Sequence, residues 1–476
     1  MRGQNTLLQR LVIAAVGAFA LVVVATSLGV EARRRGPLVV RVSRDTTSGA
    51  PKFQHETEVE PSIAAGPRGL LVTVYQVGRT VLHGSARIGW ATSRDGGRHW
   101  RHGYLEAITR PGVTPRAALD VTDAVASYDT VHKVWVAASI ADFAHGSRTL
   151  QVNRSKDGYH WSAPIEVAKG VVDKDWLTCD KGARSSFRGR CYITFTREDQ
   201  ERLGVRYSVD GGSSWSSETP ITSTLGRPTG SFPVVRPDGR LVLLFREGGA
   251  GVPGESSAKA LSPWTFTATS SLDGGRTFGS RTKVALGLPY FASHTRAVSS
   301  AITSVVADAK GRLYAVWETC RFRKTCYGND LALSTSANGS RWSTPRRLRL
   351  AEGDHVVPGL GIAPSKPGRA VRLGLSFYII SRDTCRPVNC RLTPYFASST
   401  NGGGAWTRPL RLWAPIPYLW LVQAPAGQAF IGDYTTTAYV GKVAWSAVGV
   451  ATRPTGARLH HSIAVARIRP IDLPHR

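Results

Sequence analysis

The stretch SVDGGSSW at residues 208–215 decides the fold, because relatives of it recur along the 476-residue chain. The copies share the pattern Ser-x-Asp/Asn-Gly followed by an aromatic residue, and they begin at Ser93, Ser155, Ser208, Ser271, Ser336 and Ser399. Their starts are 62, 53, 63, 65 and 63 residues apart. This period is too long for one hairpin and suits a four-stranded sheet repeated radially. The repeat therefore predicts a β-propeller.

Each copy has the chemistry of a tight β-turn. Asp or Asn accepts hydrogen bonds from backbone N–H groups within the turn, Gly tolerates positive φ, and the aromatic residue anchors the hairpin. The copies at Ser155 and Ser336 are one residue shorter before Trp, and the last two have Asn in place of Asp. Asn keeps the acceptor oxygen, so we expect all these turns to form.

The motif resembles the Asp-box of the sialidase-like superfamily of β-propellers, and the resemblance covers about residues 60–468. In that superfamily the boxes lie on the face opposite the active site. The resemblance thus implies a structural role for the motif carboxylates, which are Asp95, Asp157, Asp210 and Asp273. The runs EPSIAAG, DKDWLTCD and FIGDYTTTAYVGKVAW are similar to a broad group of exported bacterial Asp-box (BNR-repeat) proteins.

Strand pairs with turn residues between them can be counted independently of the motif. Their β-branched and aromatic residues predict strands at 60–77, 123–142, 176–199, 232–247, 301–318, 359–381 and 432–448. After the last pair only one strand-like run remains, at 461–468, so residues 38–44 are expected to supply the outer strand of the final blade. We expect an all-β fold, a seven-bladed propeller, with six blades as the alternative.

The chain is expected to hold one domain, residues 37–476, because the repetition is continuous. Arg2 and Arg10 precede an uncharged apolar run at 11–30. Residues 1–36 are therefore predicted to be a signal peptide, with an N-terminal membrane anchor through 11–30 as the alternative. Either interpretation places the domain outside the cytoplasm, secreted or at the cell surface.

Six cysteines fall into three close pairs, Cys179/Cys191, Cys320/Cys326 and Cys385/Cys390. In an exported chain such pairs predict local disulfides. Zinc binding is the rival interpretation, but the chain contains no C-x-x-C and no matching His spacing. No metal site and no cofactor are expected.

The chain carries 61 Lys and Arg against 33 Asp and Glu, a net charge of +28. Such a surface attracts polyanions, and export favours acidic glycans or cell-surface polysaccharide over nucleic acid. No nucleic-acid-binding motif is present, and the arginines are dispersed along the chain. The alternative is compositional drift towards Arg with solubility as its only consequence. We expect a monomer.

The resemblance also implies a kind of active site. A sialidase binds the substrate carboxylate with three arginines, uses a Tyr nucleophile beside a Glu, and has a protonated Asp. The loops of the expected functional face offer Tyr434 as nucleophile, Glu318 or Glu247 as its base, and Asp175 or Asp120 as the acid. The candidates for substrate binding are Arg197, Arg246, Arg296 and Arg382, with Trp176, Trp413 and Trp420 as stacking platforms. Trp135, Trp317 and Trp445 are expected to pack between blades.

One departure from the superfamily pattern bears on function. Sialidases of this kind carry Arg-Ile-Pro before the first box, whereas this chain has EPSIAAG there. The arginine triad therefore cannot be carried over residue by residue, and the resemblance transfers fold more safely than activity. The leading hypothesis is an exported glycan-recognising propeller with exo-α-sialidase-like glycoside hydrolysis. The alternative is a non-catalytic propeller that binds a cell-surface glycan or protein.

Overall fold

The computed structural model describes residues 36–46, 52–107, 119–143, 146–248, 264–288, 303–381, 388–424 and 428–473. The apolar run at 11–30, Arg296, Arg382 and Cys385 lie outside these ranges. Among the described residues, helical structure is limited to short 3-10 turns, and no helix is long and apolar enough to cross a membrane. The rest of the regular structure is antiparallel β-sheet, so the all-β prediction is confirmed.

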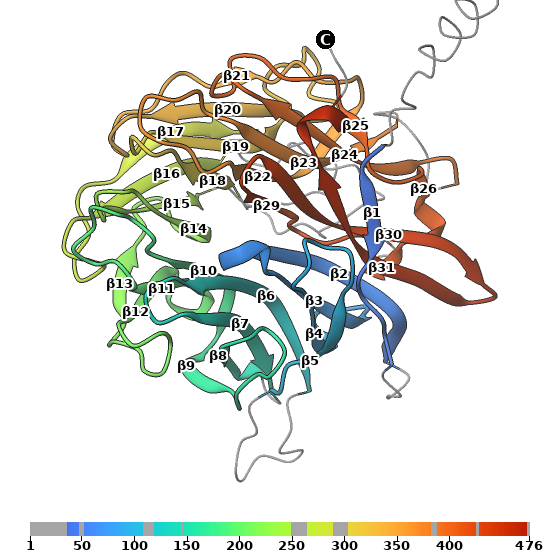
Figure 1. Cartoon of the computed structure of the whole chain (residues 1–476), viewed down its shortest axis with the longest axis horizontal. Helices are drawn as coiled ribbons and strands as arrows, with labels where there is room; N and C mark the ends of the chain where they lie inside the picture. Colours follow the sequence, from blue (N-terminus) through green and yellow to red (C-terminus); the bar gives the residue numbers. More distant parts are fainter. Residues whose placement is uncertain are drawn as a thin grey trace, which may run out of the picture. The chain divides into compact units, whose positions relative to one another are not determined.

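The described strands form successive sheets along Leu38–Arg476 (Figure 1). One eight-stranded sheet contains two units of four, joined by the single pair Ser85↔Val121. These units are β2 (Phe53–Ala65), β3 (Leu71–Thr80), β4 (Ser85–Ser93) and β5 (Arg101–Tyr104), then β6 (Asp120–Asp129), β7 (Val134–Asp142), β8 (Arg148–Ser155) and β9 (Ile165–Gly170).

Three four-stranded sheets follow in chain order. Their strands are β10 (Val172–Cys179), β11 (Cys191–Arg197), β12 (Arg202–Ser208) and β13 (Thr219–Thr222); β14 (Thr229–Val235), β15 (Leu241–Glu247), β16 (Trp264–Ser271) and β17 (Thr282–Gly287); and β18 (Ser304–Ala307), β19 (Leu313–Thr319), β20 (Asp330–Ser336) and β21 (Arg346–Arg347). The short turns η1 (Pro67–Gly69) and η3 (Glu198–Gln200) lie in the connections of the earlier sheets.

The C-terminal part holds two further large sheets and one small one. They contain β22 (Asp354–Ile362), β23 (Leu373–Ile380), β24 (Arg391–Ser399), β25 (Leu410–Arg411) and β26 (Ile416–Pro417); the pair β27 (Val422–Ala424) and β28 (Gln428–Phe430); and β29 (Thr436–Val440), β30 (Val443–Thr455) and β31 (Arg458–Ile468). The turns η4 (Tyr418–Trp420) and η6 (Pro470–Asp472) complete this region. The pair β27–β28 has no counterpart in the sequence-based prediction.

The N-terminal strand β1 (Leu38–Arg41) completes the last large sheet. It pairs antiparallel with β31, with Leu38 opposite Arg467 and Arg41 opposite Ala464. The hydrogen bond from the Val42 N–H to the Ile463 carbonyl (2.8 Å) continues this ladder. The prediction that the N-terminal run supplies the outer strand of the last sheet is therefore confirmed for residues 38–42, and β1 covers an edge of β31 that would otherwise be unpaired.

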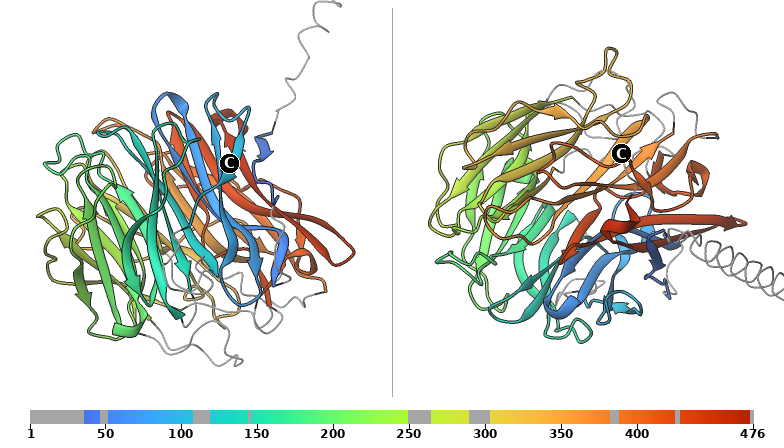
Figure 2. Two further views of the ribbon diagram at one scale, coloured as in Figure 1. Left: turned by 90° about the horizontal axis from the view of Figure 1, so that it is seen from below. Right: turned by 45° about the horizontal axis from the view of Figure 1, so that its top comes forward.

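The first strands of the sheets contact one another in chain order. Strand β2 contacts β6, and the contacts continue through β10, β14, β18 and β22 to β29, which contacts β2 again. Figures 1 and 2 show the sheets following one another around a common centre in the same order. Because the strands within each sheet alternate in direction, the beginnings of all the first strands lie at one end of the sheets.

The Ser-x-Asp/Asn-Gly turns lie at the other end, where each third strand stops. In the turn after β16, the Ser271 hydroxyl bonds Asp273 Oδ1 (2.8 Å) and accepts the Gly275 N–H (2.7 Å). Asp273 Oδ1 also accepts the Arg276 and Thr277 N–H groups, both at 3.0 Å. Corresponding serine contacts occur in the turns that begin at Ser93, Ser155, Ser208, Ser336 and Ser399. The motif carboxylates and amides thus hold the turns.

The core lies between neighbouring sheets. Gly97, at φ +72°, lies directly against the ring of Trp445 on β30, which joins the first sheet unit to the last sheet. A Cβ atom at Gly97 would lie 2.2 Å from that ring, so the turn needs glycine there. Trp135 is fully buried against Gly66, and Trp317 packs 5.3 Å from Phe266 between ring centroids. The predicted packing roles of these tryptophans are confirmed.

Two of the predicted disulfides are present. Cys179 and Cys191 lie opposite each other on β10 and β11 and are bonded, and Cys320 is bonded to Cys326. The third pair includes Cys385, which lies outside the described residues, so it stays a prediction.

Candidate active site

Charged residues occupy a strained backbone position in three consecutive first strands. The pairing of β2, β6 and β10 with their neighbours shifts register by a β-bulge at 59–62, 122–125 and 173–176. Within these bulges Glu60, Asp123 and Lys174 have φ angles of 57°, 54° and 50°. A non-glycine residue at positive φ costs about 1–3 kcal/mol and is often found at functional sites. The equivalent position in β14 is a glycine, Gly230, at φ 64°.

These residues form one hydrogen-bonded cluster with Asp433, which precedes β29. Lys174 Nζ lies 2.7 Å from Asp433 Oδ2, and the Lys174 N–H donates to Asp123 Oδ2 (2.9 Å). The Asp433 N–H donates to Glu60 Oε1 (2.9 Å). We call Glu60, Asp123, Lys174 and Asp433 the central cluster. It joins the first, second, third and last of the large sheet units.

A polar layer on β3 supports the central cluster. Gln76 Nε2 donates to Glu60 Oε2 and to Thr122 Oγ1, the latter at 3.1 Å. Arg79 Nη1 donates to Gln76 Oε1 (2.9 Å), and the Arg79 guanidinium lies over the Phe430 ring. The orientation of the Gln76 amide is thereby fixed, and Glu60 is held in place.

Burial and neighbouring charges shift the pKa values of the central cluster. Burial raises the pKa of Glu60 to about 7, with Asp433 and Asp123 adding to the effect. Burial also raises the pKa of Asp123, against the opposing charge of Lys174. For Lys174 burial opposes the charged form, yet Asp433 and Asp123 hold its pKa well above the usual value. Glu60 is thus poised to exchange a proton near neutral pH, the property required of an acid–base group.

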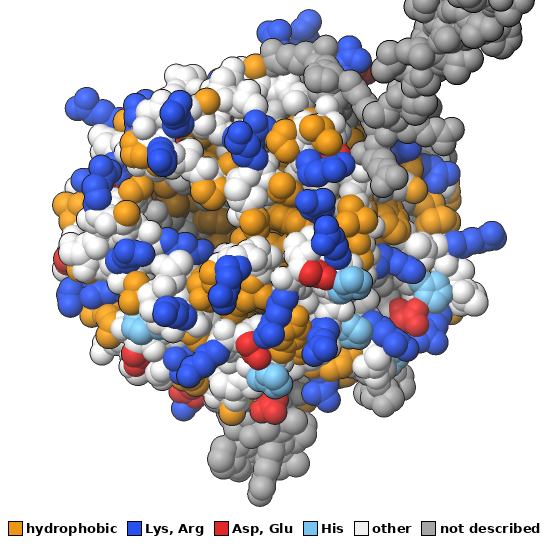
Figure 3. Space-filling model, in the orientation of Figure 1, with side chains coloured by type: hydrophobic (Ala, Val, Ile, Leu, Met, Phe, Trp, Pro, Cys, Tyr) orange, Lys and Arg blue, Asp and Glu red, His pale blue; other side chains and the backbone are white. Residues whose placement is uncertain are grey.

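The cluster is reachable from solvent. The side chains of Lys174 and Asp433 are 22% and 13% exposed, whereas Glu60 is buried. Lys174 lies near the beginning of β10 and Asp433 just before β29, towards the end of the sheets opposite the Ser-x-Asp/Asn-Gly turns, while Glu60 and Asp123 lie deeper, within β2 and β6. The surface shown in Figure 3 carries many dispersed Lys and Arg side chains and few acidic ones.

Three residues predicted from the sequence lie beside the central cluster: Tyr434, Trp176 and Asp175. The Tyr434 hydroxyl donates to the Ala124 carbonyl (2.9 Å), and its ring packs edge-on against Trp176. Burial raises the pKa of Tyr434 well above its usual value, with contributions from Glu60, Asp123 and Asp175. Trp176 is itself buried between Tyr434 and Phe232, so its faces are covered by protein.

Asp175 and Glu318 are buried carboxyls with little hydrogen bonding. Neither oxygen of Asp175 has a hydrogen-bond partner among the described residues, and burial, then Asp123, raises its pKa well above the usual value. Glu318 Oε2 accepts the Val357 N–H (3.2 Å). Burial raises the pKa of Glu318 strongly, and Asp433 is among the charges that add to this. Both environments favour the protonated acid.

The two alternative carboxylates lie in different surroundings. Glu247 accepts hydrogen bonds from Ser223 (2.8 Å) and Thr267 (2.7 Å) beside Arg281. Asp120 lies next to His83 at the beginning of β6. Neither takes part in the hydrogen bonds of the central cluster.

Where they are described, the arginines predicted to bind substrate are engaged by other protein groups, and Arg197 also donates to the Lys169 carbonyl on β9 of the preceding sheet. Arg197 forms an ion pair with Glu218 (2.5 Å). Arg246 lies over the Trp264 ring, and burial lowers its pKa to about 10. Arg296 and Arg382 lie outside the described residues. Trp413 and Trp420 pack against the core of the last sheets.

No protein-family model matches the chain. A curated sialidase of Bacteroides fragilis is 27% identical over 226 residues, which cover 42% of this chain and 40% of the relative. The chain thus matches two fifths of the length of that protein. This relative confirms the resemblance to sialidase-like proteins over the matched part.

Solved structures of similar architecture include the NanB sialidase of Streptococcus pneumoniae, with 11% identity, a TM-score of 0.46, and coverage of 71% of this chain and 67% of that one. An alpha-L-arabinofuranosidase of Fusarium graminearum gives 10% identity and a TM-score of 0.47, covering 91% and 97%. An intramolecular trans-sialidase of Ruminococcus gnavus gives 12% and 0.44, covering 90% and 100%.

Sequence reasoning placed candidates in the connecting loops and missed Glu60, Asp123 and Lys174, which lie inside strands. The available signal was a polar residue at the same place in successive first strands, as in VEPS, TDAV and DKDW. Each residue lies within the register shift that turns it out of the regular alternation.

Proposed function

We propose that residues 37–476 form a seven-bladed propeller that recognises glycans outside the cytoplasm, with a glycoside hydrolase-type centre at the central cluster. The closed circuit of first strands from β2 to β29 and back supports the blade count. The two disulfides fit an oxidising location. The proposed leader or anchor, residues 1–36, precedes this domain.

The observation that carries the proposal is the pairing of a buried Glu60, whose pKa is near neutral, with Asp433, held beside Lys174. Glycoside hydrolysis usually needs one protonated and one ionised carboxyl group. In this proposal Glu60 supplies the first, and Asp433, paired with Lys174, the second. The cluster opens to solvent through Lys174 and Asp433, where a sugar hydroxyl can meet acceptor oxygens.

The sialidase-like form of the proposal adds the residues chosen from sequence. Tyr434 would be the nucleophile, Glu318 its base and Asp175 the acid, with arginines binding a carboxylate. The positions of Tyr434 and Asp175 beside the cluster support this form. It requires the Tyr434 hydroxyl to leave the Ala124 carbonyl, and Glu318, whose pKa burial raises, to lose its proton before it can act as a base.

A non-catalytic glycan-binding propeller is the second candidate. Two predicted substrate-binding residues of the sialidase-like form are occupied by protein contacts, which favours this second candidate. The ring of Trp176 is covered, and Arg197 is paired with Glu218. In this form the central cluster binds sugar hydroxyls without cleaving a bond, while the basic surface attracts acidic polymers.

The test is turnover of a panel of methylumbelliferyl glycosides that includes a sialic-acid conjugate and an α-L-arabinofuranoside, together with a glycan array. Cleavage that is lost in Glu60→Gln supports the hydrolase. Array binding that is lost in the same variant, without any cleavage by the wild type, supports the binding module. Cleavage and binding that are both unchanged in Glu60→Gln would contradict both forms.

A further inference from the structure

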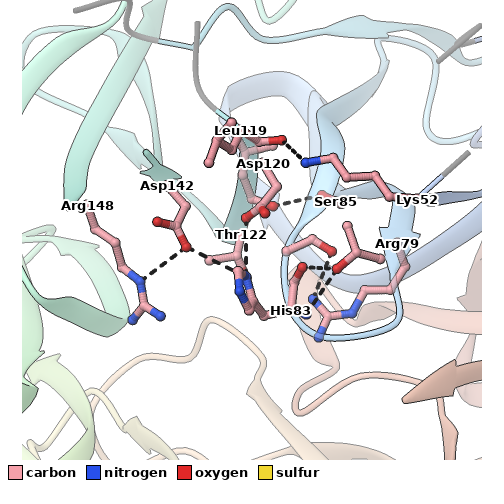
Figure 4. A network of polar contacts seen from close by, with 12 residues as sticks. Lys52, Arg79, His83, Ser85, Leu119, Asp120, Thr122, Asp142 and Arg148 are labelled. Atoms are coloured by element: carbon pink, nitrogen blue, oxygen red, sulfur yellow. Dashed lines mark hydrogen bonds and ion pairs between the residues drawn. The ribbon is translucent and has the colours of Figure 1, made fainter. Parts of the chain in front are cut away.

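A second polar group lies at the same end of the sheets, where the first two sheet units meet (Figure 4). Asp120 is the first residue of β6 and Asp142 the last of β7, and the two face each other across the ladder. His83 comes from the turn between β3 and β4. Three separate chain segments therefore place an imidazole and two carboxylates together, with their ligand atoms all within 4.8 Å of one another.

The spacings in this group suit ligands of one ion. His83 Nδ1 lies 3.5 Å from Asp120 Oδ1 and 3.6 Å from Asp142 Oδ2. Both distances exceed the usual range of N–H···O hydrogen bonds, about 2.7–3.2 Å. Two ligands of a tetrahedral ion with bonds of about 2.0–2.1 Å lie about 3.4 Å apart. The side chains thus stand as coordinating ligands would.

The burial of the two carboxylates is a second observation that favours a bound cation. The Asp120 and Asp142 side chains are only 7% and 9% exposed, and Asp120 Oδ1 accepts no hydrogen bond from any described residue. Its polar contact with His83 Nδ1 is 3.5 Å long, and a buried carboxylate oxygen that accepts no hydrogen bond is costly unless a cation compensates it. A Cβ atom at position 84 would lie 2.0 Å from Asp120 Oδ1. Gly84, which has no Cβ atom, therefore leaves room for this oxygen beside the turn.

The neighbouring cation, Arg148, also donates hydrogen bonds to residues outside this group. Arg148 Nε lies 3.5 Å from Asp142 Oδ2, while its Nη1 donates to the Val172 carbonyl and to Glu198, both at 3.2 Å. Arg148 therefore competes for one oxygen of Asp142. His83, with a side chain 56% exposed, leaves the site open to solvent.

We propose that His83, Asp120 and Asp142 bind a divalent transition-metal cation, with Zn²⁺ as the best fit. An imidazole with two carboxylates is a ligand set that Zn²⁺ accepts, and three protein ligands leave its fourth position open. Ca²⁺ would need six to eight oxygen ligands, more than this group offers. The ion would tie the β3–β4 turn to β6 and β7, and it does not depend on the proposed hydrolase.

The experiment is calorimetric titration of untagged, EDTA-dialysed full-length protein with ZnCl₂. The wild type should bind one Zn²⁺ at this site, and His83→Ala and Asp120→Asn should weaken that binding at least about tenfold. His132→Ala is the matched control, because His132 contacts a single carboxylate, Asp129, within one turn. Its Zn²⁺ affinity should equal that of the wild type.

A further variant tests whether misfolding, rather than loss of a ligand, explains weaker Zn²⁺ binding. Arg148→Met removes the competing cation and should tighten Zn²⁺ binding severalfold, a change that loss of structure would not produce. Absence of binding by the wild type would overturn the proposal. Equal affinities for wild type, His83→Ala and Asp120→Asn would overturn it as well.

Discussion

Lys174 Nζ and Asp433 Oδ2 lie 2.7 Å apart although 259 positions separate the residues in the chain. The contact joins β10 of the third sheet unit to the segment that leads into β29 of the last. A largely buried ion pair is weak evidence for stability, because desolvation offsets the attraction. Its position in the central cluster, on a bulge at positive φ, points instead to function.

Lys174→Met should destabilise the protein by roughly 2 kcal/mol, because Asp433 is left without its partner. The double variant Lys174→Met/Asp433→Asn should recover part of that loss, since position 433 no longer carries an uncompensated charge while Asp123 still lacks the opposing charge of Lys174. Urea unfolding followed by tryptophan fluorescence measures both. A double variant as unstable as the single one would show that the pair does not act through its charges.

Stability should fall as pH rises from about 4.5 to about 7, in part because of Glu60. Its folded-state pKa is raised from 4.5 to about 7, so the native state binds the extra proton and loses that advantage as pH passes through 7. Glu58, whose pKa burial raises to about 8, with Asp45 adding to the effect, acts in the same direction. Glu60→Gln should therefore reduce, without abolishing, the difference between unfolding free energies measured at pH 5 and pH 8. An unchanged difference would contradict the assignment.

The Gly97 turn offers a paired test of packing between the first and last sheets. Gly96 and Gly97 both have positive φ, but only Gly97 faces Trp445. Gly96→Ala should cost about 1 kcal/mol from backbone strain alone. Gly97→Ala should cost about 1–3 kcal/mol more, because the new methyl group meets the indole ring. Thermal unfolding of the two variants gives the comparison, and equal losses would argue against this contact.

Tyr434→Phe separates the sialidase-like chemistry from the packing role of the ring. Loss of the hydrogen bond to the Ala124 carbonyl should cost about 1 kcal/mol, so the variant should still fold. If Tyr434 is the nucleophile, turnover of any cleaved glycoside should vanish. Retained turnover would remove Tyr434 from the reaction and leave the central cluster as the acid–base group.

The architecture could be predicted from the sequence because its signals are local and repeated. The turn motif marks the end of each third strand from Ser93 to Ser399, and the apolar run at residues 38–42 supplies the outer strand of the last sheet. The neighbourhood of Tyr434 and Trp176 was also found, since both stand where first strands begin.

The central cluster could not be found in the same way. Strand alternation predicts which side chains share a face, but a bulge adds a residue and re-aims Glu60, Asp123 and Lys174. Bulges leave little trace in sequence unless glycine marks them, as Gly230 does in β14. The partners of Arg197 and Arg246 were also hidden, because they depend on tertiary contacts within a sheet and, for Arg197, with the neighbouring sheet.

The most direct test of the central claim is the turnover of methylumbelliferyl glycosides by wild type, Glu60→Gln and Asp308→Asn. Asp308 is a buried carboxylate that holds a turn by accepting the Lys310 and Arg312 N–H groups (2.9 Å each), outside the central cluster. We expect Glu60→Gln to lower kcat at least about 100-fold. Asp308→Asn should keep the wild-type rate per folded molecule. Glu60→Gln with wild-type turnover, or a loss as large in Asp308→Asn, would contradict the placement of the active centre at Glu60, Asp123, Lys174 and Asp433.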